Sequence, residues 1–175
     1  QNTSCHDTLC YTTEYNTCFL FTETFPAGLS ISGNGYVTVC AATLSPRLPV
    51  RNAIQAQMRG TSDMMVLKFD STGQDLVFCT YLGGDGHEHR TGAGWNYSSI
   101  VQGTPIATYN GDTYFCFPAS HGAPLLSTSF QAFPTYSGVN LDLAAYICSL
   151  HDDGALKGAT YLGGPGLLEL SGLSV

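Results

Sequence analysis

The densest set of potential metal-binding side chains lies in the segment Asp85-Gly86-His87-Glu88-His89-Arg90. His87 and His89 alternate with Glu88, so on an extended segment both imidazoles face one side and could ligate a transition metal beside Asp85 or Glu88. The matching place in the second half of the chain reads Pro165-Gly166-Leu167-Leu168 instead. We interpret the segment as a solvated loop that occurs once, with metal ligation by His87 and His89 as the alternative, and we expect no bound cofactor.

Two acidic turns could offer oxygen ligands to calcium. They are Asp70-Ser71-Thr72-Gly73-Gln74-Asp75 and Asp152-Asp153-Gly154. Neither has the acidic side chain that a helix-loop-helix calcium site needs about five or six positions after its glycine. A hairpin turn explains both runs, because glycine readily adopts the positive φ that short hairpin loops require. We therefore predict that Gly73 and Gly154 form turns.

The sequence shows little that could perform nucleophilic or acid–base catalysis. No Gly-x-Ser-x-Gly motif occurs, and His121, in Ala119-Ser120-His121-Gly122, has no evident acid or nucleophile partner. A glycosidase needs two facing carboxylates, whereas the acidic residues here sit mostly in turns. The glycine run Leu82-Gly83-Gly84-Asp85-Gly86 lacks the lysine and the helix of a phosphate-binding loop. We expect a protein without enzymatic activity.

Seven cysteines in 175 residues suggest an oxidising compartment. Three of them, Cys5, Cys10 and Cys18, crowd a Thr- and Asn-rich N-terminal stretch, and Cys40 and Cys116 recur at matching places in the two halves. We treat these five as disulfide candidates, with free buried thiols as the alternative. A zinc site is disfavoured because no Cys-x-x-Cys pair is present. Since the count is odd, at least one cysteine is unpaired or pairs between chains.

Composition argues against several kinds of partner. The formal net charge is −7 with only six Lys plus Arg, so the clustered cations that bind nucleic acid are lacking. No run of about 18 apolar residues is present, which argues against a membrane-spanning helix. The sequons at Asn2 and Asn96 are glycosylation candidates, and a chain that opens at Gln1 without Met looks like a product of processing. We expect an extracellular or cell-surface protein.

The elements that carry these side chains are duplicated. Thr80-Tyr81-Leu82-Gly83-Gly84 recurs letter for letter as Thr160-Tyr161-Leu162-Gly163-Gly164. Asp63 and Asp142 have nearly the same spacing as the two pentapeptides, so only small insertions separate the copies. Repeats of this kind usually stack, because one copy alone cannot bury its apolar face. We therefore assign structural roles to the repeated residues: strand ends at the two pentapeptides and caps at strand starts for Asp63 and Asp142.

Short segments rich in Val, Ile, Tyr, Phe and Thr, bounded by Gly, Pro, Asn or Asp, predict an all-β fold. The expected strands cover residues 36–41, 64–69, 76–82, 114–117, 143–150 and 155–162. Helical periodicity is nearly absent, and residues 50–58 are expected to form a loop with at most one helical turn. We divide the chain into a cysteine-bearing N-terminal segment, 1–28, a first β repeat, 29–103, and a second β repeat, 104–175.

The order of these features resembles the bacterial β-propeller repeat family known as SBBP. In that family a Gly-Asn-x-Tyr-Val-Thr strand leads to a Pro-containing loop, an Asp-x-x-Val-x-Lys-Leu strand, a Gly turn and a Tyr-Leu-Gly-Gly strand. The first copy follows this pattern from Gly33 through Asp63 and Gly73 to Gly84, and the second copy follows it more loosely. The resemblance covers about residues 30–166. It implies two propeller-blade-like antiparallel sheets in an exported bacterial protein without assigned catalysis.

Two blades cannot close a ring, since propellers use about four to eight. We therefore expect the sheet edges to be completed by neighbouring chains, because exposed edges readily accept further strands. The leading hypothesis is an extracellular structural or adhesive subunit that self-assembles into a homo-oligomer or a filament. The alternative is an exported glycan-binding module that uses aromatic side chains expected on loops, namely Trp95, Tyr97 and Tyr109.

Overall fold

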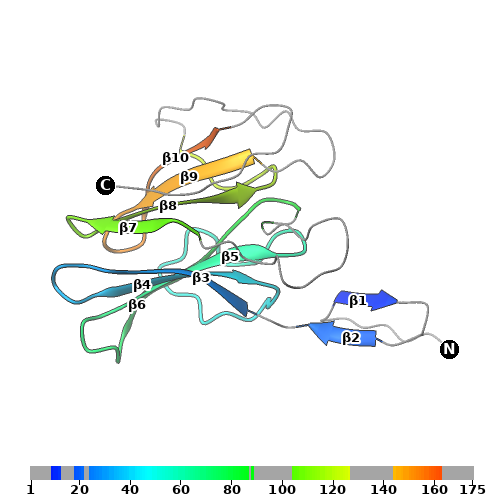
Figure 1. Cartoon of the computed structure of the whole chain (residues 1–175), viewed down its shortest axis with the longest axis horizontal. Helices are drawn as coiled ribbons and strands as arrows, with labels where there is room; N and C mark the ends of the chain where they lie inside the picture. The colour runs from blue at the N-terminus through cyan, green and yellow to red at the C-terminus, as the bar shows by residue number, and fades with distance from the viewer. Residues whose placement is uncertain are drawn as a thin grey trace.

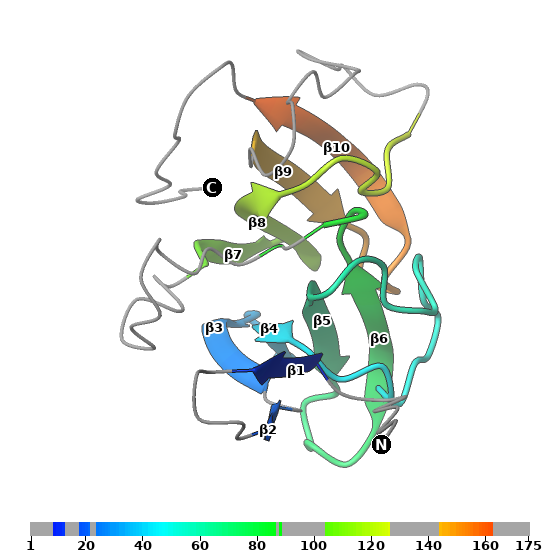
Figure 2. The ribbon, with the colours of Figure 1, turned by 90° about the vertical axis from the view of Figure 1, so that its right-hand side faces the viewer.

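The computed structural model describes residues 9–12, 18–21, 24–86, 88, 104–126 and 144–162. These residues form ten β-strands in three antiparallel sheets and contain no helix. Two sheets have four strands each and lie one above the other (Figures 1 and 2). The third is a hairpin of β1, Leu9–Thr12, and β2, Cys18–Phe21. The predicted all-β class is therefore confirmed, and residues 50–58 form a loop without a helical turn.

The first four-stranded sheet has the strand order β3-β4-β5-β6. Its strands are β3, Thr24–Ile31; β4, Val37–Thr43; β5, Asp63–Phe69; and β6, Leu76–Leu82. The last three form where the sequence pattern predicts strands. The loop between β4 and β5 returns to the outer edge of β6, where Arg51 pairs with Cys79 and Gln55 pairs with Tyr81. This loop therefore covers one edge of the first sheet.

The second four-stranded sheet repeats this topology in the order β10-β9-β8-β7. Its strands are β7, Ile106–Tyr109; β8, Asp112–Ala119; β9, Ala144–Leu150; and β10, Leu156–Leu162. The hairpin turns before β6 and β10 contain Gly73 and Gly154, whose φ angles are 71° and 94°. A side chain is strained in this left-handed region, so glycine is the natural residue there. The final hairpin of each sheet is therefore built in the same way.

The sequence pattern does not predict β3 or β7. β3 contains Pro26 and Gly28, two residue types that are depleted in strands, and its register with β4 shifts between them. A bulge of this kind lets a strand accommodate such residues. β3 begins at Thr24, ahead of the boundary drawn at residue 28. β7 is only four residues long and is mostly half-buried, so it carries little periodic signal.

Strand registers show which residues of the two sheets are equivalent. In the first sheet Thr43 opposes Asp63, and in the second sheet Ala119, the counterpart of Thr43 at the end of β8, opposes Ala144. β9 therefore matches β5 at a slightly larger offset than the one that aligns Asp63 with Asp142. Ala144, not Asp142, stands at the place of Asp63, and Asp142 lies outside the described residues.

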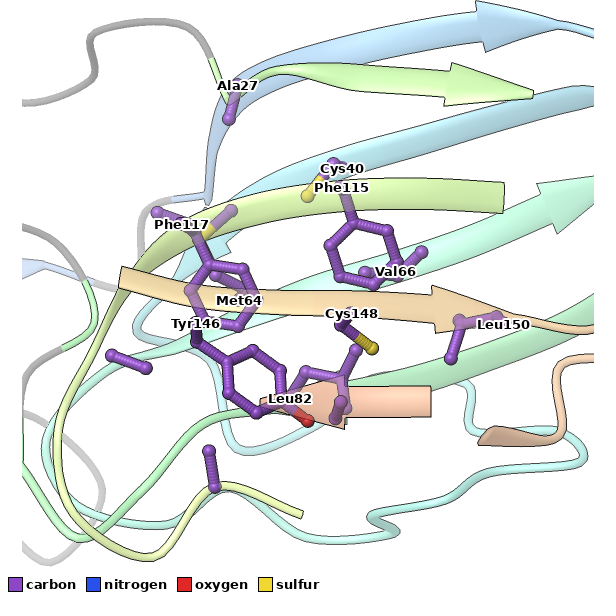
Figure 3. Packing of buried hydrophobic residues seen from close by; sticks show 14 of the residues in the cluster. Ala27, Cys40, Met64, Val66, Leu82, Phe115, Phe117, Tyr146, Cys148 and Leu150 are labelled. Carbon is purple, nitrogen blue, oxygen red and sulfur yellow. The ribbon is translucent and has the colours of Figure 1, made fainter. Parts of the chain in front are cut away.

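An apolar core fills the space between the two four-stranded sheets (Figure 3). The first sheet contributes mainly non-aromatic side chains and one ring; they are chiefly Cys40, Ala42, Met64, Val66, Leu82 and Phe78. The second sheet contributes more aromatic side chains, chiefly Phe115, Phe117, Tyr146 and Tyr161, with Cys148 and Leu150. Burial of this apolar surface is the main force that holds the two sheets together.

The two sheets contact each other through opposite faces. Cys40 of β4 points into the core, whereas its counterpart Cys116 lies between the core residues Phe115 and Phe117 of β8. Because side chains alternate along a strand, Cys116 points away from the core. Each sheet therefore has a core face and an outward face, and the outward face of the first sheet corresponds to the core face of the second. The sheets are stacked front to back.

Candidate functional site

The Gly83-Gly84 pair marks the place where the first sheet meets the loop after β8. A Cβ atom added to Gly84 would lie 2.1 Å from the backbone oxygen of His121, and one added to Gly83 would lie 2.4 Å from Asp63 Oδ1. The backbone N–H of Asp85 donates a hydrogen bond of 2.7 Å to the same His121 oxygen. Only glycines allow so close an approach. The glycines of the first pentapeptide are therefore needed where the two repeats meet.

Asp63, the first residue of β5, is buried at this contact with an exposed fraction of 0%. Its Oδ2 atom accepts hydrogen bonds from Gln55 Nε2 at 2.6 Å and from the backbone N–H of Arg59 at 2.9 Å. The other end of the Gln55 amide accepts a hydrogen bond of 3.2 Å from the backbone N–H of Gly83. Asp63 and Gln55 thus fix the loop before β5 to the end of β6.

Glu88 lies beside Asp63 and is 1% exposed. Its Oε1 atom accepts hydrogen bonds from the backbone N–H of Gly84 at 2.7 Å and from Ser120 Oγ at 2.5 Å. Ser120 follows β8, so Glu88 joins the end of the first sheet to the second. Close by, Arg59 Nη1 donates a hydrogen bond of 2.8 Å to the backbone oxygen of Gly122. Polar contacts therefore tie the two repeats together at this end of the core.

Two carboxyl oxygens of this pair, Asp63 Oδ1 and Glu88 Oε2, are buried without a hydrogen-bond partner among the described residues. Both carboxyl groups lie within contact distance of a Cβ placed on Gly83. Burial raises the pKa of Asp63 to about 8, against the hydrogen bond from Arg59, and the nearby charge of Glu88 adds to the rise. Burial also raises the pKa of Glu88, against its hydrogen bonds from Ser120. One proton shared by the two carboxyl groups satisfies both oxygens.

This arrangement suits a structural joint better than a reaction centre. Both carboxyl groups are closed off from solvent, and their other partners are groups of the two repeats. At the rim, Asp85 and His121 form an exposed pair with 3.5 Å between Oδ2 and Nδ1. Among the residues that the structure describes, no group of three or more His, Cys, Asp or Glu is placed to hold a metal ion. We refer to Asp63 and Glu88 as the carboxyl pair.

A second polar contact joins the sheets at the opposite end of the core. Lys68 points from the core face of β5 and is 1% exposed. Its Nζ atom donates a hydrogen bond of 3.1 Å to the backbone oxygen of Gly111 and forms an ion pair with Asp152 in the turn before β10. The ammonium group also lies 5.4 Å from the ring centre of Tyr36, within reach of a cation–π contact. The core is thus bounded by a polar contact at each end.

The tyrosines of the repeated pentapeptide anchor loops. Tyr81 Oη donates to the backbone oxygen of Ser45 at 2.8 Å and accepts from the N–H of Leu48 at 3.0 Å. Tyr161 Oη bonds in the same way to the backbone oxygen of Ser120 at 2.7 Å and the N–H of Ala123 at 2.9 Å. Each tyrosine therefore fastens the loop that leaves the second strand of its own sheet. This explains why the motif occurs in both repeats.

The structure does not contain the disulfide bond expected at Cys40 or Cys116. Both are free, as are the other cysteines with described side chains, Cys79 and Cys148. Cys40 points into the core and Cys116 points outward from the second sheet, so the two sulfur atoms cannot meet. Burial raises the pKa of Cys40 to about 12, which keeps this thiol protonated. Free buried thiols, the alternative reading of the sequence, describe these positions.

Several predicted site residues lie outside the described part of the chain. They are the metal candidates His87 and His89, the motif residues Asp142, Gly163 and Gly164, the sequon residues Asn2 and Asn96, and Cys5. Cys10 and Cys18 lie on β1 and β2 as neighbouring strands of the hairpin. Glu88, which the sequence places in a solvated loop, is instead buried. Its burial follows from the fold of both repeats, so no local signal in the sequence could reveal it.

Large exposed apolar side chains gather on the outermost strands. The two most exposed, Leu29 and Ile31, lie on β3, at 58% and 63%. Tyr109 is 57% exposed at the end of β7, on a strand rather than the expected loop, and Leu162 is 44% exposed at the end of β10. Among the residues whose side-chain exposure is described, which excludes β1 and β2, only Val50 joins these four as an exposed large hydrophobic residue. The apolar surface therefore follows the strands at which the sheets end.

No protein-family model matches the chain, and no curated protein matches it at a significant level. The resemblance to SBBP repeats therefore stays a prediction. The structure shows two four-stranded antiparallel sheets, and neither closes on itself within the described residues. The described part of the chain has no helix long and apolar enough to cross a membrane.

Proposed function

We propose that this chain is an extracellular structural or adhesive subunit that assembles with copies of itself, as a homo-oligomer or a filament, through its open sheet edges. The observation that carries this proposal is the position of the exposed apolar side chains. Four of the five lie on β3, β7 and β10, the strands at the ends of the sheet orders. Open strand edges with apolar neighbours are natural sites for adding a further strand.

The outer edge of β6 shows that these sheets accept a further extended segment. The backbone of Arg51 exchanges hydrogen bonds with Cys79 at 3.0 and 2.8 Å, and Gln55 pairs with Tyr81. A segment from outside the four strands therefore already extends the first sheet, and strand addition between copies would use backbone hydrogen bonds of the same kind.

An extracellular location is consistent with the chemistry of the described side chains. Charged residues make up only 11% of the sequence, against roughly 25% in typical soluble domains, so hydroxyl and amide groups hydrate much of the surface. The cysteines with described side chains are buried, and burial raises the pKa of Cys40, Cys79, Cys116 and Cys148. Protonated, buried thiols resist oxidation and need no reducing compartment.

Sedimentation velocity over a wide concentration range, combined with electron microscopy, tests the proposal. We expect species larger than the 18.6 kDa monomer, growing with concentration, and elongated particles if the contact does not close. The same series with reductant is the control that separates strand addition from bridges between chains. A single monomeric species at every concentration would contradict self-assembly.

A further inference from the structure

The outward face of the first sheet carries an apolar patch next to its β3 edge. Leu29 and Ile31, exposed at 58% and 63%, oppose Val39 and Val37 of β4. The patch continues onto β5 through half-buried side chains. We call this surface the first-sheet patch; it consists of Leu29, Ile31, Val37, Val39, Leu67 and Phe69. Contiguous exposed apolar surface of this kind marks an interaction site.

The equivalent surface of the second sheet is buried inside the molecule. By strand register, Phe115 stands at the place of Val39, and Leu150 stands at the place of Phe69. Both Phe115 and Leu150 are fully buried against the core face of the first sheet. The first-sheet patch is therefore exposed, whereas the equivalent surface of the second sheet is covered by the first sheet.

The surface that would fit this patch is also present in the chain. The outward face of the second sheet corresponds by register to the core face of the first, with Ile147 at the place of Val66. It carries partly open apolar side chains, of which Tyr109 and Leu162 are the most exposed, and Lys157 lies over the ring of Tyr114 and pairs with Asp112. We call it the second-sheet patch; it consists of Tyr109, Tyr114, Ile147 and Leu162.

We propose that the first-sheet patch of one copy docks on the second-sheet patch of another copy, so that the front-to-back contact within each molecule is repeated between molecules. This inference rests on the proposed self-assembly and adds a contact between sheet faces to the edge contact of that proposal. The occupant is a second copy of this chain, because the internal interface shows that the same two kinds of face already pack together. Two different surfaces meet, so the contact is heterologous and produces a ring or an open filament.

The contact between molecules lacks one polar element of the internal contact. Inside the molecule, Lys68 of the first sheet reaches Asp152 in a turn of the second. By register Ser149 stands at the place of Lys68, and Ser71 stands at the place of Asp152 in the equivalent turn. Between copies, Ser149 therefore faces Ser71 of the neighbour, and these two positions form no ion pair. The contact between molecules is the weaker of the two.

Complementary surface variants test the proposal in the full chain. Ile31→Glu changes the first-sheet patch and Tyr109→Glu changes the second, and each is expected to weaken self-association about tenfold or more. Both side chains are exposed, so circular dichroism should show an unchanged fold. A mixture of the two variants retains one intact contact and should form a one-to-one complex that grows no further. Val50→Glu, in the loop beside β6, is the matched control and should assemble normally.

The outcomes separate this inference from the proposed function. If the unmodified chain assembles and Tyr109→Glu assembles equally well, or the mixture stays monomeric, the docking proposal is wrong while self-assembly stands. If the unmodified chain never assembles, both are wrong. A gain-of-function pair gives an independent check: Ser71→Asp with Ser149→Lys rebuilds the internal ion pair between copies and should tighten association about threefold. No gain over the two single variants would contradict the proposed alignment.

Discussion

The two four-stranded sheets share their topology and differ in the polar side chains that join them. Both have a tyrosine that anchors a loop and a glycine in the final hairpin turn. Only the first sheet has Asp63 and Lys68, whose places in the second are taken by Ala144 and Ser149. The anchoring tyrosine and the turn glycine, present in both copies, therefore act within a repeat, whereas Lys68 and the carboxyl pair, present in one copy, help to join the two repeats. This distinction separates residues that build a sheet from residues that join two sheets.

The largest difference in stability is expected between alanine variants at one equivalent position of the two sheets, Leu150 in the second and Phe69 in the first. Leu150→Ala removes a fully buried side chain from the core and should lower the free energy of unfolding by about 2–5 kcal/mol. Phe69→Ala removes a larger side chain at the equivalent position, but this one is half-buried on the outward face, so about 1 kcal/mol is expected. Urea unfolding of the monomeric chain measures both. A larger loss for Phe69→Ala would contradict the assignment of core and outward faces.

Asp63→Ala gives the first sheet the residue that the second sheet has. It removes the acceptor of two hydrogen bonds, from Gln55 Nε2 and from the N–H of Arg59, and the carboxyl group beside Glu88, which should cost about 3 kcal/mol in urea unfolding. Asp63→Asn is the matched control. Its oxygen can accept both hydrogen bonds and its amide can donate to Glu88, so the loss should be below about 1 kcal/mol. Equal losses for both variants would contradict a carboxyl pair that shares a proton.

Lys68→Ser makes the opposite end of the core resemble the second sheet. The variant loses charge-assisted hydrogen bonds to Gly111 and Asp152, and a loss of about 2 kcal/mol in unfolding free energy is expected. Asp152 is largely exposed, so water can hydrate it once the lysine is gone. Ser149→Lys, on the outward face, is the control and should leave the stability of the monomer unchanged. An unaffected Lys68→Ser protein would show that this contact does not join the sheets.

The pH dependence of stability spreads its effect over several pH units. The pKa of Asp63 is raised in the folded state to about 8, above its ordinary value of 3.8, so the folded state holds this proton to higher pH than the unfolded state. Its stabilising contribution is complete below about pH 4 and is lost as pH rises through about 8, by at most about 1.4 kcal/mol per pH unit. Asp63→Asn cannot ionise and should lose less stability over this range. Parallel stability curves for the two proteins would argue against the raised pKa.

The strands of the repeats could be predicted because their signals are local. Segments rich in Val, Ile, Tyr, Phe and Thr, bounded by turn residues, locate β4, β5, β6, β8, β9 and β10. β3 could not be predicted because Pro26 and Gly28 are poor strand residues that its bulge accommodates. The direction of stacking could not be inferred either. Neighbouring residues such as Met64 and Met65 place apolar side chains on both faces of β5, so either face could have met the second sheet.

The joint between the repeats depends on contacts that no local pattern reveals. The position of Asp63 at the start of a strand could be predicted. Its contact with Glu88 could not, because Glu88 follows β6 in a segment that has no equivalent in the second repeat. Glu88 in turn is held by Ser120, beyond the next two strands. Because Asp63 and Asp142 have nearly the same spacing as the two pentapeptides, the sequence suggests Asp142 as the counterpart of Asp63. The register of β9 assigns that position to Ala144 instead.

The central claim is that the two sheets pack front to back, with Val66 inside and Val39 outside. Nuclear Overhauser contacts between valine methyl groups and phenylalanine rings, recorded on the monomeric chain, test it most directly. The structure predicts contacts from the Val66 methyls to the core rings of Phe115 or Phe117, and none from Val39. Contacts from Val39 to these rings, with none from Val66, would show that the first sheet presents its other face and would overturn the account.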